Sequence, residues 1–255
     1  MSADVTPDQK TALITGASSG IGEAIARRFM AEGYRVLSAQ RRPAPVGESL
    51  SADLLQPGAA QAVMAQVSAH TDRLDVLVNN AGLMLEGTAE ESSEADWQAQ
   101  MDLNLSLPFM LTREALPLLR QSDGGAIVNI GSVEGLAANP RHPAYAASKA
   151  GLHGLTRAIA VDEGPRGVRC NAVAPGWIDT PLNLDFIESL TGDTAAFHAG
   201  LKDIHPVGRT GRPQEVADLV YWLGSDQAGF MTGQVLTLDG GRTAKLSLPL
   251  SLIHI

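Results

Sequence analysis

The stretch TGASSGIGEAIARRF, Thr15–Phe29, places three glycines, Gly16, Gly20 and Gly22, directly before a segment with helical character. The apolar run TALITG (11–16) leads into it and predicts a buried strand. Glycines at this spacing let the chain turn sharply and bring backbone N–H groups and a helix N-terminus against a pyrophosphate. The stretch therefore predicts a strand, turn and helix that hold a dinucleotide, although glycines needed only for turn packing would give the same pattern.

Short apolar runs recur along the chain and alternate with Ala-rich segments of helical period. The runs span residues 11–16, 34–39, 74–82, 125–132, 168–176 and 234–241, and the expected helices span 20–32, 57–70, 94–120, 144–163 and 213–224. Continuous runs of four to six apolar residues fit strands buried on both faces. We predict an α/β fold, a Rossmann-type doubly wound parallel sheet in a single domain (1–255), with the fold itself at about 10–242.

Two segments depart from this alternation. Residues 181–212 follow a strand end and predict a mobile helical insertion that serves as a substrate lid. The tail, 243–255, is apolar and lies outside the pattern, so it either packs in a subunit interface or ends in residues added by cloning or read-through.

Composition narrows the function classes. The chain has 255 residues, of which 44% are hydrophobic and 18% charged, and its net charge of −9 offers no basic surface for nucleic acid. No apolar run approaches the roughly 20 residues of a membrane span, and we expect a cytoplasmic protein. Cys170 is the only cysteine and the six histidines form no short-spaced ligand pair, so we expect no metal site.

The end of the second strand bears on cofactor choice. The segment LSAQRRP (37–43) carries neutral Gln40 followed by Arg41 and Arg42, with no acid to bind a ribose 2′-hydroxyl. Two guanidinium groups favour the 2′-phosphate of NADP, although a solvated basic turn is the alternative. Asp53, in the segment 51–56, is placed to accept from the adenine amino group, but a helix N-cap has the same appearance.

The segment PAYAASKAG (143–151) holds Tyr145 and Lys149 four residues apart among small side chains. On a helix both project from one face. A neighbouring ammonium stabilises a phenolate and lowers the tyrosine pKa, which makes an acid or base for a substrate oxygen. A surface Tyr and Lys on an amphipathic helix would give the same spacing.

Several motifs occur in a fixed order: TGASSGIG (15–22), NNAG (79–82), the serine at 132, YAASK (145–149) and PGWIDT (175–180). Together they resemble the short-chain dehydrogenase/reductase family, including its ketoacyl reductase-like members, over about residues 10–242.

The resemblance implies a catalytic set. Tyr145 is then the acid/base at the substrate oxygen, Lys149 lowers its pKa and binds the nicotinamide ribose, and Ser132 hydrogen-bonds the substrate oxygen. Asn104, in MDLNLSLPF (101–109), is the helix asparagine that holds a water in a proton relay from Lys149. Besides Tyr145 and Lys149, the implied cofactor-binding residues are Gly16, Ser18, Ser19, Gly20, Ile21, Gly22, Arg41, Arg42, Asp53, Asn79, Ala81, Gly82, Pro175, Gly176, Ile178 and Thr180.

Departures from the family pattern concern the substrate and the cofactor. Gly131 stands where relatives often carry Ser or Ala, which predicts extra room beside Ser132. Ser19 replaces a basic residue of some NADP-preferring members, which weakens the NADP interpretation. Glu134 and His142 flank Ser132 and Tyr145 in sequence and either face the substrate pocket, where they would suit a polar or hydroxyl-bearing substrate, or face solvent.

The resulting hypothesis is an NADP(H)-dependent oxidoreductase, with NAD(H) possible, that interconverts a carbonyl and a secondary alcohol. An NAD-dependent sugar or polyol dehydrogenase is the alternative within enzymes, and a dinucleotide-binding redox sensor without turnover is the alternative outside them. The resemblance also implies a homotetramer that shares the helices near 94–120 and 144–163.

Overall fold

A single seven-stranded sheet runs through the molecule. The computed structural model describes residues 9–189 and 193–246, and within them all strands pair in parallel in the order β3-β2-β1-β4-β5-β6-β7. The strands are β1 (Thr11–Thr15), β2 (Arg35–Gln40), β3 (Glu48–Ser51), β4 (Val76–Asn79), β5 (Ala126–Ile130), β6 (Arg169–Pro175) and β7 (Val235–Leu238). The predicted doubly wound Rossmann-type sheet in one domain is confirmed.

The burial of each strand explains why apolar runs in the sequence predicted six of the strands and did not predict β3. Every residue of β1, β4 and β5 is buried, as expected for central strands covered on both faces. β3 lies at the sheet edge beyond β2, and only Leu50 of its four residues is buried. An edge strand with one apolar residue leaves no apolar run, so the sequence prediction contained six strands rather than seven.

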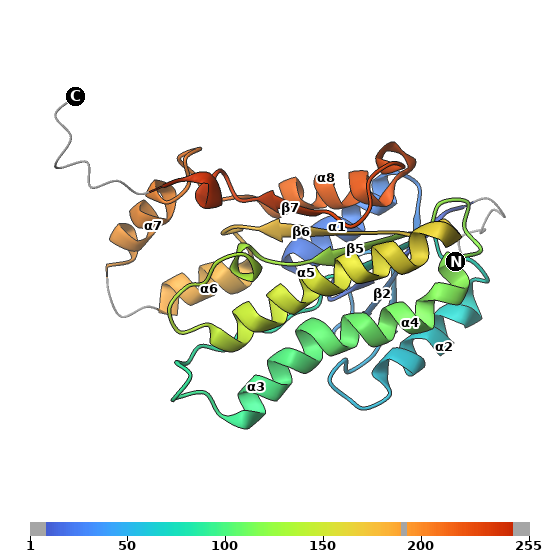
Figure 1. The fold of residues 1–255 in the computed structure, drawn as a ribbon, viewed down its shortest axis with the longest axis horizontal. Helices are drawn as coiled ribbons and strands as arrows, with labels where there is room; N and C mark the ends of the chain where they lie inside the picture. Colours follow the sequence, from blue (N-terminus) through green and yellow to red (C-terminus); the bar gives the residue numbers. More distant parts are fainter. Residues whose placement is uncertain (1–8, 190–192, 247–255) are drawn as a thin grey trace.

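Helices cover both faces of the sheet. Figure 1 shows α2 (Ala59–His70), α4 (Leu107–Leu119) and α5 (Pro143–Glu163) on one face, with α1 (Gly20–Ala31) and α8 (Pro213–Gly224) on the other. Phe29 and Val220 belong to the core between the sheet and α1 and α8, whereas Leu111 and Ile127 belong to the core on the other face. The alternation of strand and helix thus buries two apolar layers in one sheet.

The predicted helix 94–120 consists of three consecutive segments. These are α3 (Glu94–Met101), a π-helical turn η1 (Asp102–Ser106) and α4. A π-helical turn inserts extra chain into a helix and often marks a functional site. Asn104 lies within this turn and is fully buried.

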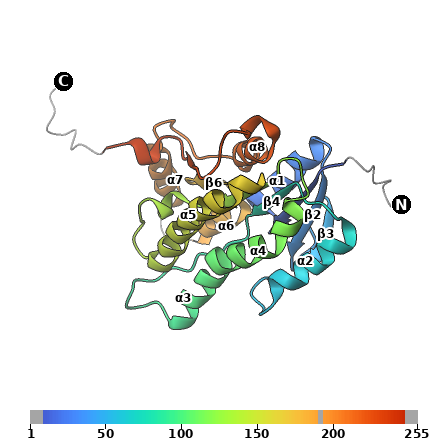
Figure 2. The ribbon, with the colours of Figure 1, turned by 45° about the vertical axis from the view of Figure 1, so that its right-hand side comes forward.

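The region predicted as a lid is helical. It holds α6 (Pro181–Ser189) and α7 (Thr194–Asp203), which Figures 1 and 2 place at the end of the sheet where the carboxyl ends of the strands lie. Residues 190–192 and 247–255, which include most of the predicted tail, lie outside the described residues. Short 3-10 turns complete the chain at η2 (Val133–Gly135), η3 (Gly164–Arg166), η4 (Asp226–Ala228) and η5 (Arg242–Ala244). In the part of the chain that the structure describes, no helix is both long and apolar enough to cross a membrane.

Candidate active site

The glycine-rich turn has the geometry that the sequence predicted. Gly16 and Gly20 adopt φ of 72° and 60°, a region that favours glycine. A β-carbon built on Gly22 would lie 2.2 Å from the carbonyl oxygen of Gly16, so only glycine fits there. Asn80 fixes the turn from below, because its Nδ2 donates to the carbonyls of Thr15 and Gly16 at 2.9 and 3.1 Å.

The turn delivers the N-terminus of α1 to the end of the sheet. Ser19 occupies the N-cap position in extended conformation, and its side chain makes no capping hydrogen bond. The first backbone N–H groups of α1 are therefore available to an external acceptor, and the helix dipole favours an anion there. The turn lies where the strand order changes direction between β1 and β4, the place where ligands bind in such sheets.

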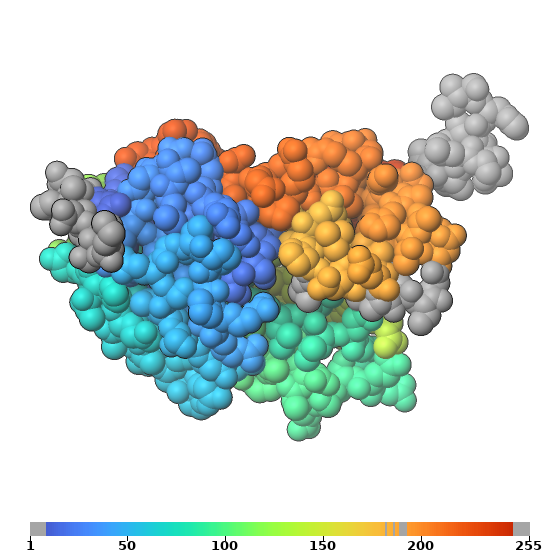
Figure 3. All heavy atoms as spheres, turned by 180° about the vertical axis from the view of Figure 1, so that it is seen from behind, coloured from blue at the N-terminus to red at the C-terminus, as the bar shows by residue number. Residues whose placement is uncertain are grey.

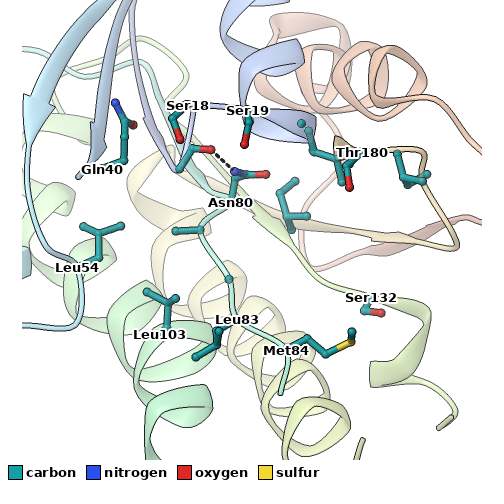
Figure 4. Close-up of a pocket in the computed structure, with 18 of the residues that line it drawn as sticks. Ser18, Ser19, Gln40, Leu54, Asn80, Leu83, Met84, Leu103, Ser132 and Thr180 are labelled. Carbon is teal, nitrogen blue, oxygen red and sulfur yellow. Dashed lines mark hydrogen bonds between the residues drawn. The ribbon is translucent and has the colours of Figure 1, made fainter. Parts of the chain in front are cut away.

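A cleft of about 740 Å³ opens over the carboxyl ends of the strands. In Figure 3 it lies between the blue N-terminal segments and the yellow-orange α6, and Figure 4 shows its lining at close range. Of the implied site residues, the following line it: Gly16, Ser18, Ser19, Gly20, Ile21, Gly22, Arg41, Arg42, Asp53, Ala81, Gly82, Ser132, Tyr145, Lys149, Pro175, Gly176, Ile178 and Thr180. The sequence analysis did not single out the other lining residues, which include Asn80, Leu54, Leu83, Met84, Leu103 and Asn183.

The end of β2 presents two cations to the cleft. Gln40 is buried and folds back, with its Oε1 accepting from the N–H of Ala17 at 3.2 Å. Arg41 and Arg42 are exposed and line the cleft. Asp53 is the only carboxylate among the cleft-lining residues that the structure describes. The charge of this end of the cleft therefore suits an anionic group.

Asp53 does not cap a helix. The N-cap of α2 is Gly58, whereas the Oδ1 of Asp53 accepts from the N–H of Leu55 at 3.2 Å and closes a local turn. The helix-cap interpretation of Asp53 is therefore wrong, and its carboxylate lines the cleft.

Three polar side chains from two elements meet on the opposite wall of the cleft. Ser132 ends the loop after β5 and is hydrogen-bonded to Tyr145, which lies one turn into α5. Lys149 follows on the same face of α5, with its Nζ 5.6 Å from the centre of the Tyr145 ring. That Nζ donates to the carbonyl of Ile130 at 2.8 Å, so the end of β5 holds the ammonium in place. A hydroxyl, a phenol and an ammonium thus line one wall of the cleft.

Comparison with known proteins agrees with this arrangement. Residues 16–243 match the family described as enoyl-(acyl carrier protein) reductase. The chain is 37% identical over 246 residues to 3-oxoacyl-[acyl-carrier-protein] reductase FabG of Thermotoga maritima, covering 91% of this chain and 97% of that protein. The chain belongs to the short-chain dehydrogenase/reductase family.

Two further relatives show how widely the family varies. A 3beta-hydroxysteroid dehydrogenase 1 of Eggerthella lenta is 38% identical over 249 residues, covering 92% of this chain and 94% of that protein. The ligand-free structure of Thermoplasma acidophilum aldohexose dehydrogenase superposes with a TM-score of 0.89 at 35% identity, covering 94% and 97% of the two chains. The chain is thus a short-chain dehydrogenase that acts on CH–OH groups.

The pKa of Tyr145 moves against the sequence prediction. Burial and the charge of Glu134 together raise it to about 12, against the lowering effect of the hydrogen bond with Ser132. The sequence predicted that Lys149 would lower this pKa, whereas desolvation makes the largest contribution and raises it. The phenol is consequently held in its protonated form at neutral pH. Burial also lowers the pKa of Lys149, to about 8.

Asn104 braces the cleft wall in this dehydrogenase. Its Nδ2 donates to the carbonyl of Leu83 at 2.8 Å and to the hydroxyl of Ser148 at 3.0 Å, and its Oδ1 accepts from the N–H of Leu83 at 2.8 Å. The π-helical turn thus connects the loop after β4 to α5. The predicted role in a water relay remains a prediction.

Asn79 and Asn80 of the motif NNAG have different surroundings. Asn79 is buried at the end of β4 and donates to Asn129 at 2.8 Å, and it is not among the residues that line the cleft. Asn80, just after the strand, lines the cleft. The implied contact of Asn79 with the cofactor remains a prediction.

The extra room predicted at Gly131 is wrong. A β-carbon there would lie 2.3 Å from Nε2 of His153, and one at Gly135 would lie 2.5 Å from Cε1 of the same ring. The buried imidazole of His153 therefore fills the space that the glycines leave beside the Ser132 loop. Nothing in the sequence joins residues 131 and 153, so only the fold reveals this contact.

Glu134 and His142 form a pair beside Tyr145. Nδ1 of His142 lies 2.9 Å from Oε2 of Glu134, and the imidazole meets the Tyr145 ring edge-on at 6.4 Å between centres. Both side chains are about 90% buried, with 12% and 11% exposed, so neither is a freely solvated surface group. They are not among the residues that line the 740 Å³ cleft and instead continue the wall beyond Tyr145.

Proposed function

We propose that this protein is an NADP(H)-dependent oxidoreductase that interconverts a carbonyl and a secondary alcohol. The observation that carries the proposal is the meeting of Ser132, Tyr145 and Lys149 on one wall of a cleft whose other end is cradled by the glycine turn. A bound nicotinamide dinucleotide would supply or accept the hydride in this reaction.

The residues of the cleft fit such a cofactor. The tight approach of Gly22 to the Gly16 carbonyl and the uncapped N-terminus of α1 make a cradle for a pyrophosphate. At the far end, Arg41 and Arg42 would hold a 2′-phosphate, and Asp53 would accept from an adenine amino group. Gln40 supplies no carboxylate to repel that phosphate, which favours NADP over NAD.

Tyr145 and Ser132 manage the proton at the substrate oxygen. With a pKa raised to about 12, Tyr145 is protonated at neutral pH and can donate to an oxygen that gains negative charge. Ser132 is hydrogen-bonded to that phenol and can stabilise the same oxygen. A protonated tyrosine can supply the proton that carbonyl reduction needs, and its phenolate would take the proton in the reverse reaction.

The relatives support the reaction class. By their names, they act on 3-oxoacyl groups, a 3-hydroxysteroid and an aldohexose, and each of these changes between a carbonyl and an alcohol. The lid, α6 and α7, would close over the substrate as the cleft is filled.

We propose a homotetramer in the cytoplasm. Phe109 and Met110 on α4 and Val161 on α5 are large apolar side chains exposed on the outer face, with Val161 75% exposed. Apolar side chains on neighbouring helices of one face suit a contact between copies of the chain. Light scattering coupled to size-exclusion chromatography would measure the mass; a monomer would contradict the proposal.

Replacing Tyr145 by Phe tests the mechanism. The change removes the phenolic proton donor and keeps the ring, so we expect kcat for any carbonyl substrate to fall by roughly 100- to 10,000-fold. NADPH binding, measured by fluorescence titration, should change by less than about 3-fold, because the ring keeps its packing. Near wild-type turnover in Tyr145→Phe would rule out this mechanism. Tight NADPH binding by the wild type with no turnover on a carbonyl panel would favour a redox sensor instead.

A further inference from the structure

Two loops that are distant in sequence are tied together beside the catalytic tyrosine. The N–H of Gly87, after β4, donates to the carbonyl of Arg141, before α5, at 2.8 Å. Arg141 has φ of 67°, unusual for a residue with a side chain, and its guanidinium pairs with Glu91 at 2.8 Å. Arg141, the strained residue, directly precedes His142. The backbone conformation of Arg141 therefore fixes the position from which the His142 side chain projects.

His142 lies between two carboxylates. Its Nδ1 is 2.9 Å from Glu134, and its Nε2 is 3.7 Å from Oε1 of Glu86. The first distance is a hydrogen bond, whereas the second exceeds hydrogen-bond range. Nε2 of His142 and Oε1 of Glu86 are therefore not bonded to each other, and each can accept from a separate hydroxyl. Glu134 is held in turn by the N–H of Asn139 at 3.4 Å.

The set Glu86, Glu134 and His142 lies next to Ser132 and Tyr145, and each of its members has its own relation to them. Glu134 follows Ser132 by two residues and donates its N–H to the Ser132 hydroxyl oxygen at 3.1 Å. His142 contacts the Tyr145 ring, and Glu86 follows Met84 by two residues. In Figure 4 the Met84 side chain points toward Ser132, so the loop that carries Glu86 faces the catalytic serine. A substrate whose oxygen meets Ser132 and Tyr145 therefore extends along these polar groups.

The charge of the set limits what it can bind. Two carboxylates face one imidazole, so the set is negative whether or not His142 carries a proton. An anionic substrate would be repelled, and an apolar chain would remove solvent from a carboxylate without replacing its hydrogen bonds. A neutral substrate with hydroxyl groups would instead donate to Glu86 and bond to Nε2 of His142.

We propose that Glu86, Glu134 and His142 select neutral polyhydroxylated substrates, of the class of ketoses, aldoses and their polyols. One hydroxyl of the substrate donates to Glu86 and a neighbouring hydroxyl donates to Nε2 of His142, while Glu134 accepts from Nδ1 and orients the imidazole. This inference rests on the proposed function, because it needs a carbonyl at Ser132 and Tyr145.

The cation Arg242 lies near this set and could bind a competing class of substrate, the hydroxy acids and keto acids. Arg242 donates from Nη2 to Oδ1 of Asn139 at 2.7 Å, and Asn139 also binds Glu134. A hydroxy acid or keto acid would have to place its carboxylate on Arg242 and keep it away from Glu86. Substitution of Arg242 therefore separates the two classes.

The test compares three ketones with four-carbon chains in NADPH oxidation: erythrulose, 2-butanone and acetoacetate. They are polyhydroxylated, hydroxyl-free and anionic, respectively. We expect kcat/KM for erythrulose to exceed both others by roughly 10- to 100-fold, the effect of one or two hydrogen bonds to charged groups. Preference for 2-butanone or acetoacetate would overturn the inference and leave the proposed function intact. If none of the three ketones were reduced, both would fail.

Variants locate the selectivity. Glu86→Ala removes an exposed carboxylate and should lower kcat/KM for erythrulose by roughly 10-fold or more, and by more than it lowers that for 2-butanone. His142→Phe keeps a ring against Tyr145 and should likewise lower kcat/KM for erythrulose more than that for 2-butanone. Glu90→Ala, an exposed carboxylate on the same loop, is the matched control and should change neither value. A loss with Arg242→Ala but not with Glu86→Ala would overturn the assignment.

Discussion

The imidazole of His153 occupies the space that a side chain at residue 131 would need, with Nε2 only 2.3 Å from the position of a β-carbon on Gly131. Gly131 directly precedes Ser132, and its N–H donates to the carbonyl of Val173 at 2.7 Å, so the backbone there cannot easily move. The size of one buried ring on α5 thus determines which residue can precede Ser132.

Replacing Gly131 by Ala should overpack this contact. We expect the free energy of unfolding to fall by about 1–3 kcal/mol and kcat to fall as the Ser132 loop is displaced. Denaturant unfolding and steady-state kinetics measure the two effects. Adding His153→Ala should restore part of both, because it frees the space. Gly154→Ala, on the same helix with nothing within 4 Å of the added carbon, is the control and should stabilise by about 0.5–1 kcal/mol. Equal losses for Gly131→Ala with and without His153 would contradict the contact.

His153 also predicts sensitivity to acid. Desolvation, together with the charges of Lys149 and Arg157, lowers its pKa from 6.5 to about 4. Between pH 6.5 and 4 the unfolded chain therefore binds a proton that the folded chain does not, and stability falls as the pH falls through this window. The loss is up to roughly 3 kcal/mol. In His153→Leu the free energy of unfolding should depend less on pH. His198 is exposed, so His198→Asn should leave the pH dependence unchanged. Denaturant unfolding at pH 7 and pH 5 measures this difference. If wild type and His153→Leu lose the same free energy of unfolding between the two pH values, His153 is not the cause of the acid sensitivity.

The fold and most of the cofactor cleft were readable from the sequence, because they depend on local patterns. The turn at Gly16 and Gly22 and the pairing of Tyr145 with Lys149 lie within short segments whose geometry is nearly fixed by strand and helix periods. The motif NNAG shows the limit of such patterns. Asn79 is buried at the end of β4 and Asn80, the next residue, lines the cleft, and the motif does not say which of the two does so.

The parts that the sequence did not predict depend on distant contacts. The π-helical turn that buries Asn104 has the composition of an ordinary helix, and His153 meets Gly131 across 22 residues of chain. Glu86 approaches His142 only because the Gly87 N–H binds the Arg141 carbonyl. The sign of the Tyr145 pKa shift was wrong for a related reason, since desolvation depends on every neighbour and spacing gives only one.

The lowered pKa of Lys149 predicts that this residue's contribution to the free energy of unfolding increases as the pH becomes alkaline. Burial lowers its pKa from 10.5 to about 8, so between these values the unfolded chain binds one more proton than the folded chain. The free energy of unfolding from this group therefore rises as the pH rises from 8, by up to roughly 3 kcal/mol at pH 10.5. Lys149→Met keeps the stem of the side chain and should remove this rise.

The difference between wild type and Lys149→Met isolates the effect of the lysine. Burial also raises the pKa of Cys170 to about 12, which lowers stability above pH 9, but that contribution is common to both proteins. Thermal unfolding at pH 7.5, 8.5 and 9.5 should show the variant more stable than wild type at pH 7.5, with the gap closing as the pH rises. A gap independent of pH would contradict a shifted lysine.

Arg41 and Arg42 predict the cofactor preference, because they are the cations that the end of β2 presents to the cleft. In Arg41→Ala the Kd for NADPH should rise by roughly 10-fold or more, the loss of a charge-assisted contact, while the Kd for NADH stays within about 2-fold. Arg42→Ala should act in the same way, and the double variant should bind both cofactors alike. Arg27→Ala, which removes a guanidinium paired with Glu23 on the outer side of α1, is the matched control and should change neither Kd.

Titration at 50 and 300 mM salt adds a second readout, since the NADPH preference of the wild type should shrink as salt screens the arginines. If both variants retain the wild-type ratio of the two Kd values, the arginines do not determine the cofactor preference and form a solvated turn.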